Sequence, residues 1–174
     1  DQGWKIKIKK YPLLTGIGSK RKSTQVGPRQ WNSPIQSGIP HEGFYTQNEI
    51  KEIIGYAKKR HITIIPEIEM PGHSVAALTA YPEYSCTGGP FEVEGRWGVF
   101  NDIYCTKEST FTFMQDILDE VVELFPSSYI HLGGDEAPRI RWKNCVHCQE
   151  RMKQEHVTKE AELQTYFINR IENY

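Results

Sequence analysis

The residues best suited to carry out chemistry form the run His131-Leu132-Gly133-Gly134-Asp135-Glu136. Its two glycines remove side-chain bulk beside two adjacent carboxylates, which point in different directions because side chains alternate along an extended chain. Repulsion between two close carboxylates raises the pKa of one of them, so that it keeps a proton near neutral pH. A proton donor next to a carboxylate that stabilises positive charge is what cleavage of a glycosidic bond requires. Spacing alone supports equally well a turn whose acids cap the next helix.

A second group of polar residues lies in the run Pro66-Glu67-Ile68-Glu69-Met70-Pro71-Gly72-His73. Glu69 and His73 lie four residues apart in what we expect to be a tight turn. A carboxylate bonded to an imidazole fixes its tautomer and raises its basicity, so this pair could support a catalytic site. The alternative, which spacing alone favours, is a buried histidine whose hydrogen bonds are satisfied.

Both polar runs follow short apolar segments that predict buried strands. Ile62-Thr63-Ile64-Ile65 precedes the first run, and Tyr129-Ile130-His131-Leu132 leads into the second. Continuous apolar runs of this length are typical of strands in a parallel sheet, where both faces are covered. Acids just past the carboxyl ends of such strands lie where active sites are found in βα barrels.

Helical patterns separate these strands, so the sequence predicts an α/β fold of parallel βα units. A capping box of Thr46 and Glu49 begins the first long helix. The first ten residues alternate between apolar residues and lysines, which predicts an extended segment with one buried face. The remaining expected elements are helices at 74–80, about 109–124 and about 159–174, with long loops at 15–43 and 81–106.

Composition excludes several classes of protein. The chain has 174 residues, a net charge of −1 and 38% hydrophobic residues, which is unlike a disordered or nucleic-acid-binding protein. It contains no apolar run approaching the roughly 20 residues that span a membrane. The basic residues concentrated between positions 5 and 29, Arg29 among them, are interpreted as a solvated loop rather than a surface for an anionic partner. Because the chain begins at Asp1 without a methionine or an apolar leader, we expect it to be processed or internal to a longer protein.

The four cysteines are Cys86, Cys105, Cys145 and Cys148. Cys145 and Cys148 have the spacing of one half of a zinc motif, but structural zinc typically uses two such pairs. A local disulfide or free thiols are therefore the favoured interpretation, and Cys86 could pair with Cys105 in an oxidising compartment. A small zinc-containing domain around residues 145–156, with His147 and His156 as further candidate ligands, stays open as an alternative.

Three segments together resemble glycoside hydrolase family 20, which contains the β-N-acetylhexosaminidases and chitobiases. They are Asp1-Gln2-Gly3-Trp4, the run from Pro66 to His73, and the run from His131 to Glu136. They occur in the family's order and spacing, and the resemblance covers essentially the whole chain. The run from His131 to Glu136 is highly specific to the family, whereas the other two segments would be weaker alone.

The resemblance implies a (β/α)8 barrel of the TIM type, of which residues 1–174 would supply one partial catalytic domain of about three βα units. It implies a retaining exo-β-N-acetylhexosaminidase that releases terminal β-linked N-acetylglucosamine or N-acetylgalactosamine. In this substrate-assisted mechanism the 2-acetamido oxygen attacks its own anomeric carbon and forms an oxazolinium intermediate. The alternative is a non-catalytic carbohydrate-binding relative, which both intact acids argue against.

The resemblance also assigns roles to individual residues. Glu136 resembles the general acid that protonates the leaving oxygen and then acts as base on water, and Asp135 resembles the residue that holds the acetamido N–H. His73 and Glu69 resemble a pair that orients and polarises the surroundings of Glu136. Asp1 and His131 are further supporting or substrate-binding candidates, and neither a metal nor a cofactor is implied.

The chain departs from the family's pattern at its ends. Only Asp1 remains of two acids that normally precede the Gln-Gly-Trp motif, and the strands that should flank residues 1–174 are not in this sequence. We therefore expect a fragment of a longer protein that is poorly active alone. The expected partner is a glycan ending in N-acetylhexosamine, or a chitooligosaccharide, with no nucleic acid and no membrane segment, and the family suggests a periplasmic or extracellular location.

Overall fold

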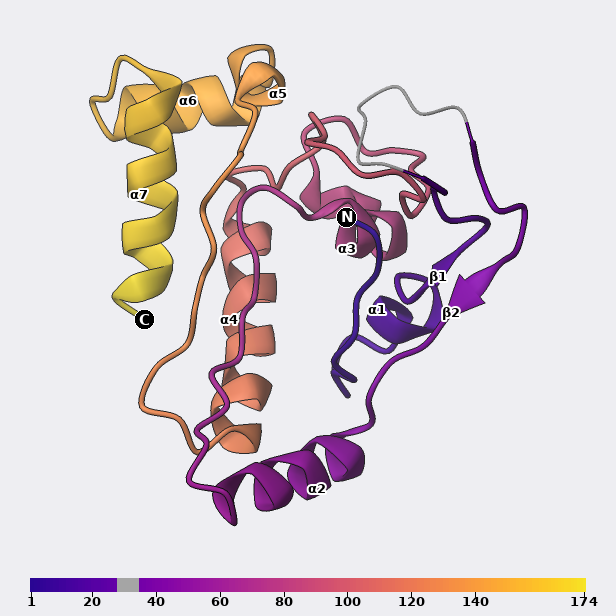
Figure 1. Ribbon diagram of the computed structural model, residues 1–174. Coiled ribbons are helices and arrows are strands. Elements are labelled where there is room, and N and C mark those ends of the chain that lie inside the picture. The colour runs from indigo at the N-terminus through magenta and orange to yellow at the C-terminus, as the bar shows by residue number, and fades with distance from the viewer. Residues whose placement is uncertain (28–34) are drawn as a thin grey trace.

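The computed structural model describes residues 1–27 and 35–174 of the chain (Figure 1). Within them, helices alternate with long extended segments, and the regular sheet is a single antiparallel pair of strands, β1 and β2. None of the helices in these two ranges is both long enough and apolar enough to cross a membrane. The elements are α1 (Leu13–Gly16), β1 (Lys20–Arg21), β2 (His41–Glu42), α2 (Gln47–Lys58), α3 (Val75–Ala80), the 3-10 turn η1 (Pro82–Tyr84), α4 (Glu108–Leu124), α5 (Ile140–Lys143), α6 (Val146–Gln154) and α7 (Glu160–Glu172).

The predicted capping box at the start of α2 is confirmed. The side chain of Thr46 accepts a hydrogen bond from the backbone N–H of Glu49, while the Glu49 carboxylate accepts one from the Thr46 N–H. These two bonds satisfy backbone donors that the first turn of a helix otherwise leaves free. The helices predicted at 74–80, 109–124 and 159–174 are also present, as α3, α4 and α7.

Helix α4 lies at the centre of the core because one of its faces is almost wholly apolar. Phe113 on this face is fully buried and stacks on Tyr84 at 4.1 Å between ring centroids, and Tyr11 contacts it edge-on at 4.5 Å. Two residues earlier in α4, Phe111 packs against Phe167 of α7, with ring centroids 4.9 Å apart. Figure 1 shows the two segments that carry the acidic runs passing along this helix.

These two segments pair in parallel, as the strand predictions require, but four residues later than predicted for the first of them. The Ile68 N–H donates to the His131 carbonyl at 2.9 Å, and the Met70 N–H donates to that of Leu132 at 3.1 Å. Neither predicted strand is buried as expected: Ile62 and Ile65 of the first are 58% and 52% exposed, and Tyr129 of the second is 73% exposed. Residues 62–65 belong to no strand among the described residues. A strand buried on both faces needs a neighbour on each edge and cover on each side, and only one such neighbour is described.

The N-terminal segment is extended, as predicted. It pairs in parallel with the chain just before α2, through bonds from the Lys7 N–H to the Tyr45 carbonyl and from the Tyr45 N–H to the Lys5 carbonyl. Ile8 is fully buried and Lys7 is exposed, in keeping with one apolar face.

Part of the predicted loop at 15–43 lies outside the described residues, namely positions 28–34, and Arg29 of the basic stretch lies there too. Three basic residues before that gap form ion pairs with acids elsewhere, Lys10 with Asp116, Lys20 with Glu42 and Lys22 with Glu92. These pairs favour the solvated-surface interpretation of the basic stretch.

Candidate active site

The parallel pairing places two acidic turns side by side where the paired segments end. The first turn leads from Glu69 to His73, and the second from Gly133 to Glu136. His73 and Glu136 have φ angles of 47° and 43°, in the left-handed region that residues other than glycine rarely occupy. Strained backbone of this kind persists where the surrounding structure imposes it, and it is concentrated at functional sites.

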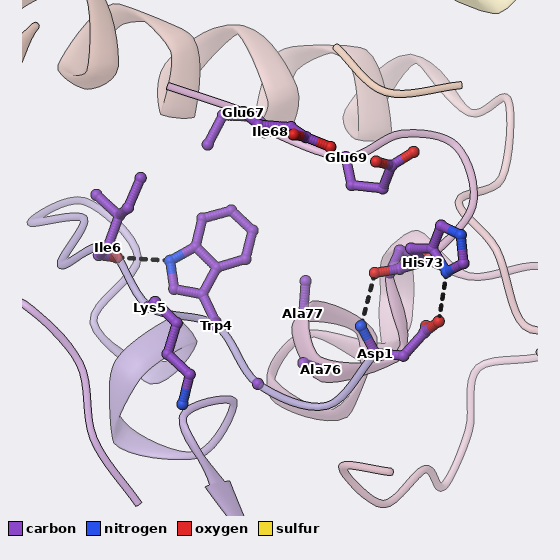
Figure 2. A pocket seen from close by; sticks show the side chains of 12 residues that line it. Asp1, Trp4, Lys5, Ile6, Glu67, Ile68, Glu69, His73, Ala76 and Ala77 are labelled. Atoms are coloured by element: carbon purple, nitrogen blue, oxygen red, sulfur yellow. Dashed lines mark hydrogen bonds and ion pairs between the residues drawn. The ribbon is translucent and has the colours of Figure 1, made fainter. Parts of the chain in front are cut away.

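His73 is held by Asp1, from the opposite end of the sequence. The Asp1 carboxylate is 1% exposed, and its Oδ2 atom lies 2.8 Å from His73 Nδ1. Its other oxygen accepts from the Val75 N–H at 3.1 Å, and the Asp1 main-chain nitrogen donates to the His73 carbonyl at 2.9 Å. Figure 2 shows both contacts between Asp1 and His73. Because an ionised carboxylate only accepts, the neutral imidazole carries its hydrogen on Nδ1 and leaves Nε2 as an acceptor.

The free edge of this imidazole faces both acids of the second turn. His73 Nε2 lies 3.5 Å from Glu136 Oε2 and 3.8 Å from Asp135 Oδ2. The side chains of Asp135 and Glu136 are 67% and 57% exposed, so both are accessible to a ligand. The arrangement is a line of three groups, from the buried Asp1 through His73 to the accessible Glu136, with Asp135 beside it.

Glu69 has a different partner from the predicted one. Its Oε1 accepts from the Gly134 N–H at 2.8 Å, whereas the hydrogen bond of the His73 ring goes to Asp1. Among the described contacts, the expected direct bond between Glu69 and His73 is absent, because the turn between them directs the two side chains to different hydrogen-bond partners. Burial, reinforced by the charge of Asp135, raises the pKa of Glu69 to about 7, although the bond from Gly134 opposes the shift.

Gly133 allows the Glu69 carboxylate to reach this position. A Cβ atom at Gly133 would lie 2.0 Å from Glu69 Oε1, and the φ of Gly133 is +69°. Only glycine meets both requirements without strain. Gly133 therefore leaves space for the Glu69 carboxylate, which in turn binds the backbone N–H of Gly134.

His131 lies apart from the group around His73. Its ring is 61% exposed, and its Nδ1 accepts from the Gly133 N–H at 3.1 Å and lies 3.6 Å from Glu67 Oε1. His131 thus shapes the entry to the glycine turn, and in this structure it contacts neither Asp135 nor Glu136.

A cavity of about 240 Å³ is lined in part by Asp1 and His73 (Figure 2). Trp4 and Glu69 also line it, and the Trp4 indole N–H donates to the Ile6 carbonyl at 2.5 Å. Trp4 was predicted to belong to the N-terminal alternation and motif but not to line a cavity, and Asp1 was not predicted to be the partner of His73. The signal available for both was the motif Asp1-Gln2-Gly3-Trp4 itself.

Two groups of side chains in the described residues have ligand atoms close enough to share a cation. One consists of His73, Asp135 and Glu136, and the other of the four cysteines. Clusters of exposed acids like the first group are common in proteins that bind no metal there. Acids that take part in acid–base chemistry must also be able to gain and lose protons.

Comparison with known proteins gives a consistent result over the whole chain. A β-hexosaminidase of Porphyromonas gingivalis is 48% identical over 173 residues, which are 99% of this chain and 21% of that protein. One of Vibrio furnissii is 41% identical, across 97% of this chain and 27% of its own length. The chain thus spans between about a fifth and a third of such relatives.

Solved structures of β-N-acetylhexosaminidases are also similar to this chain. A crystal structure of a β-N-acetylhexosaminidase superposes with a TM-score of 0.89 at 35% identity, covering 98% of this chain and 34% of the other. The β-N-acetylhexosaminidase of Bacteroides fragilis superposes with a TM-score of 0.76 at 42% identity, covering 95% and 29%. The model of the glycosyl hydrolase family 20 catalytic domain matches residues 1–174. The chain therefore belongs to glycosyl hydrolase family 20 and is part of that family's catalytic domain.

Proposed function

We propose that the protein containing this chain hydrolyses terminal β-linked N-acetylglucosamine or N-acetylgalactosamine with retention of configuration. The observation that carries the proposal is the line from Asp1 through His73 to Glu136, with Asp135 beside it. It combines one oriented acid–base group with a second accessible carboxylate. We also propose that the rest of the protein completes a (β/α)8 barrel around these segments, which would cover exposed apolar residues such as Ile62 and Ile65.

In the first step the acetamido oxygen of the substrate attacks the anomeric carbon, and the bond from that carbon to the leaving oxygen breaks. Glu136 gives its proton to the leaving oxygen. Asp135 accepts a hydrogen bond from the acetamido N–H and stabilises the positive charge of the oxazolinium ring that forms. Because the nucleophile belongs to the substrate, the attack has the advantage of an intramolecular reaction.

In the second step water attacks the same carbon from the side that the leaving group left. Glu136, now ionised, takes a proton from this water, and the oxazolinium ring reopens to the acetamido group. Two inversions at one carbon give net retention. The His73 imidazole, with its hydrogen directed to Asp1, orients the Glu136 carboxyl group throughout.

The substrate class is supported by the relatives. A family 20 exo-β-N-acetylglucosaminidase of Vibrio harveyi, 34% identical to this chain with a TM-score of 0.78, was solved in complex with N-acetylglucosamine. We propose that the substrate here is a glycan or chitooligosaccharide that ends in the same sugar or in its epimer, N-acetylgalactosamine. A periplasmic or extracellular location is part of the proposal and is supported only by the family.

The experiment uses the full-length protein that contains this chain. Hydrolysis of chitobiose, whose sugar leaving group needs a proton, is measured for wild type, Glu136→Gln and a control, Glu52→Gln, whose side chain is exposed on α2. We expect kcat/KM to fall by about 100- to 10,000-fold in Glu136→Gln and to be unchanged in the control. A wild-type protein that binds N-acetylglucosamine without turnover would instead favour the carbohydrate-binding alternative.

A further inference from the structure

The four cysteines of the chain converge on one point, although Cys86 and Cys148 are 62 residues apart. Cys86 Sγ and Cys148 Sγ are 3.6 Å apart, and Cys105 Sγ lies 3.6 Å from both Cys145 Sγ and Cys148 Sγ. All four sulfur atoms lie within 4.8 Å of one another. Cys105, Cys145 and Cys148 are buried, and Cys86 is partly buried.

This spacing matches the corners of a metal-centred tetrahedron. With zinc–sulfur bonds of about 2.3 Å, two thiolates of a tetrahedral site lie roughly 3.8 Å apart. All four cysteines are free. A disulfide bond would bring one pair of sulfur atoms to about 2.05 Å and would not explain why the other two sulfur atoms lie beside that pair. An iron–sulfur cluster would hold the sulfurs further apart, because its own iron and sulfide ions lie between them.

We propose that Cys86, Cys105, Cys145 and Cys148 together bind one Zn²⁺ ion as a structural site. The four thiol protons pass to solvent on binding, and no oxidation or reduction takes place. Four protein ligands fill the coordination sphere and leave no position for water or substrate, as in structural rather than catalytic zinc sites.

The surroundings of the cluster suit thiolates. Thr106 follows Cys105, and its buried hydroxyl has no hydrogen-bond partner among the residues that the structure describes. Because Thr106 directly follows Cys105 in the chain, its unpaired hydroxyl is a candidate donor to a thiolate of the cluster. Outer donors of this kind are a regular part of metal sites.

The site would fasten two regions that also border the candidate active site. Cys86 and Cys105 bracket the long loop after η1, and Cys145 and Cys148 lie at the start of α6. Two other hydrogen bonds join the same regions. The Trp142 indole N–H donates to the Tyr104 carbonyl at 2.8 Å, and the Tyr104 N–H donates to the Pro71 carbonyl at 3.0 Å. Through Pro71 the metal would support the turn that presents His73.

This proposal departs from the expectation of no metal, and it differs from the small zinc domain weighed at 145–156. That alternative used His147 and His156, but both lie outside the group of sulfur atoms. The sequence supplied the right number of cysteines. It did not show that the pair at 145–148 and the two single cysteines belong to one site, because that depends on contacts between residues 40 or more positions apart.

The test measures zinc per chain in the full-length protein, purified under reducing conditions and then incubated with Zn²⁺ and dialysed. We expect the double variant Cys145→Ser/Cys148→Ser to hold one zinc fewer than wild type, and the control His147→Ala to hold as much as wild type. Co²⁺ in place of Zn²⁺ should give the visible spectrum of a tetrahedral thiolate site in wild type and lose it in the double variant. If the double variant does not fold, the same comparison is made with Cys86→Ser, which alters the least buried ligand.

Three results would overturn the proposal: equal zinc content in wild type and the cysteine variants, disulfides among these cysteines in the reduced and zinc-loaded wild type, or the absorption of an iron–sulfur cluster. Stripping wild type with a chelator adds a structural readout. The thermal midpoint should fall and should recover on adding Zn²⁺ alone. None of these measurements depends on hydrolase activity, so the site and the proposed function succeed or fail separately.

Discussion

Asp1 and His73 are separated by 72 residues in the sequence, yet Asp1 Oδ2 lies 2.8 Å from His73 Nδ1, and the aspartate carboxylate is almost completely buried. A buried carboxylate that is bonded to an imidazole fixes which nitrogen carries the hydrogen. His73 Nε2 is thereby presented to Glu136 and Asp135. The N-terminal motif and the two acidic turns thus form one unit.

Replacing Asp1 by asparagine in the full-length protein should lower kcat by about 10- to 1,000-fold while KM changes little. The asparagine amide can donate to His73 Nδ1 and so stabilise the wrong tautomer, although its oxygen can still accept from the Val75 N–H. Steady-state kinetics across a pH series measure the effect. Asp119→Asn is the matched control, since Asp119 is bonded only to the exposed Tyr174 among the described contacts. A wild-type kcat in Asp1→Asn would show that His73 does not depend on Asp1.

Replacing Glu69 by glutamine should flatten the dependence of stability on pH between about 4.5 and 7. Burial raises the pKa of Glu69 to about 7 in the folded state, from 4.5 for an unperturbed glutamate. The folded state therefore holds a proton that the unfolded state releases, and stability is lost as pH rises through this range. Glutamine stays neutral and can still accept from the Gly134 N–H. Thermal midpoints measured from pH 4 to 8 check this, and parallel curves for variant and wild type would contradict it.

Replacing Gly133 by alanine should lower the free energy of unfolding by about 1–2 kcal/mol, because residue 133 has a left-handed backbone conformation that alanine disfavours. The new methyl group would also push the Glu69 carboxylate from its bond with Gly134. Gly55→Ala is a sharp control, because Gly55 lies within α2 with nothing within 4 Å of its Cβ position. That change should stabilise the protein by up to about 1 kcal/mol. Denaturant unfolding compares the two, and equal effects would show that Gly133 is not sterically required.

Replacing Glu108 by glutamine should reduce stability slightly at neutral pH. Hydrogen bonds from Arg170 and then Arg151 lower the pKa of Glu108 to about 2, so its stabilising effect is present above about 4.5 and is lost as pH falls towards 2. Because the Glu108 side chain is 62% exposed, we expect a loss of less than about 1 kcal/mol. Unfolding at low and high salt measures it, since salt screens such pairs. A loss unaffected by both pH and salt would show that charge is not its cause.

Local signals predicted much of this structure, and long-range contacts account for most of what was missed. The capping box of α2 and the apolar face of α4 are written within a few consecutive residues, so both helices were predictable. Helices α5 and α6 were missed because they carry few apolar residues, and single buried side chains such as Trp142 and Cys148 hold them in place.

The residues of the candidate site also fall into those predicted from nearby sequence and those revealed only by long-range contacts. Asp135 and Glu136 were identified from one run of six residues, and His73 from another, but the partner of His73 was chosen by its nearness in sequence. The actual partner, Asp1, comes from a segment 72 residues away. Only the packing of the chain could bring that carboxylate to the imidazole.

The central claim is that Glu136 donates the proton to the leaving group, and its most direct test compares two substrates in the full-length protein. Glu136→Gln is assayed with an activated aryl β-N-acetylglucosaminide, whose leaving group needs little protonation, and with chitobiose, whose sugar leaving group needs a proton. We predict a much larger loss of kcat/KM for chitobiose than for the aryl substrate. An equal loss for both substrates would contradict the assignment of Glu136 as the acid.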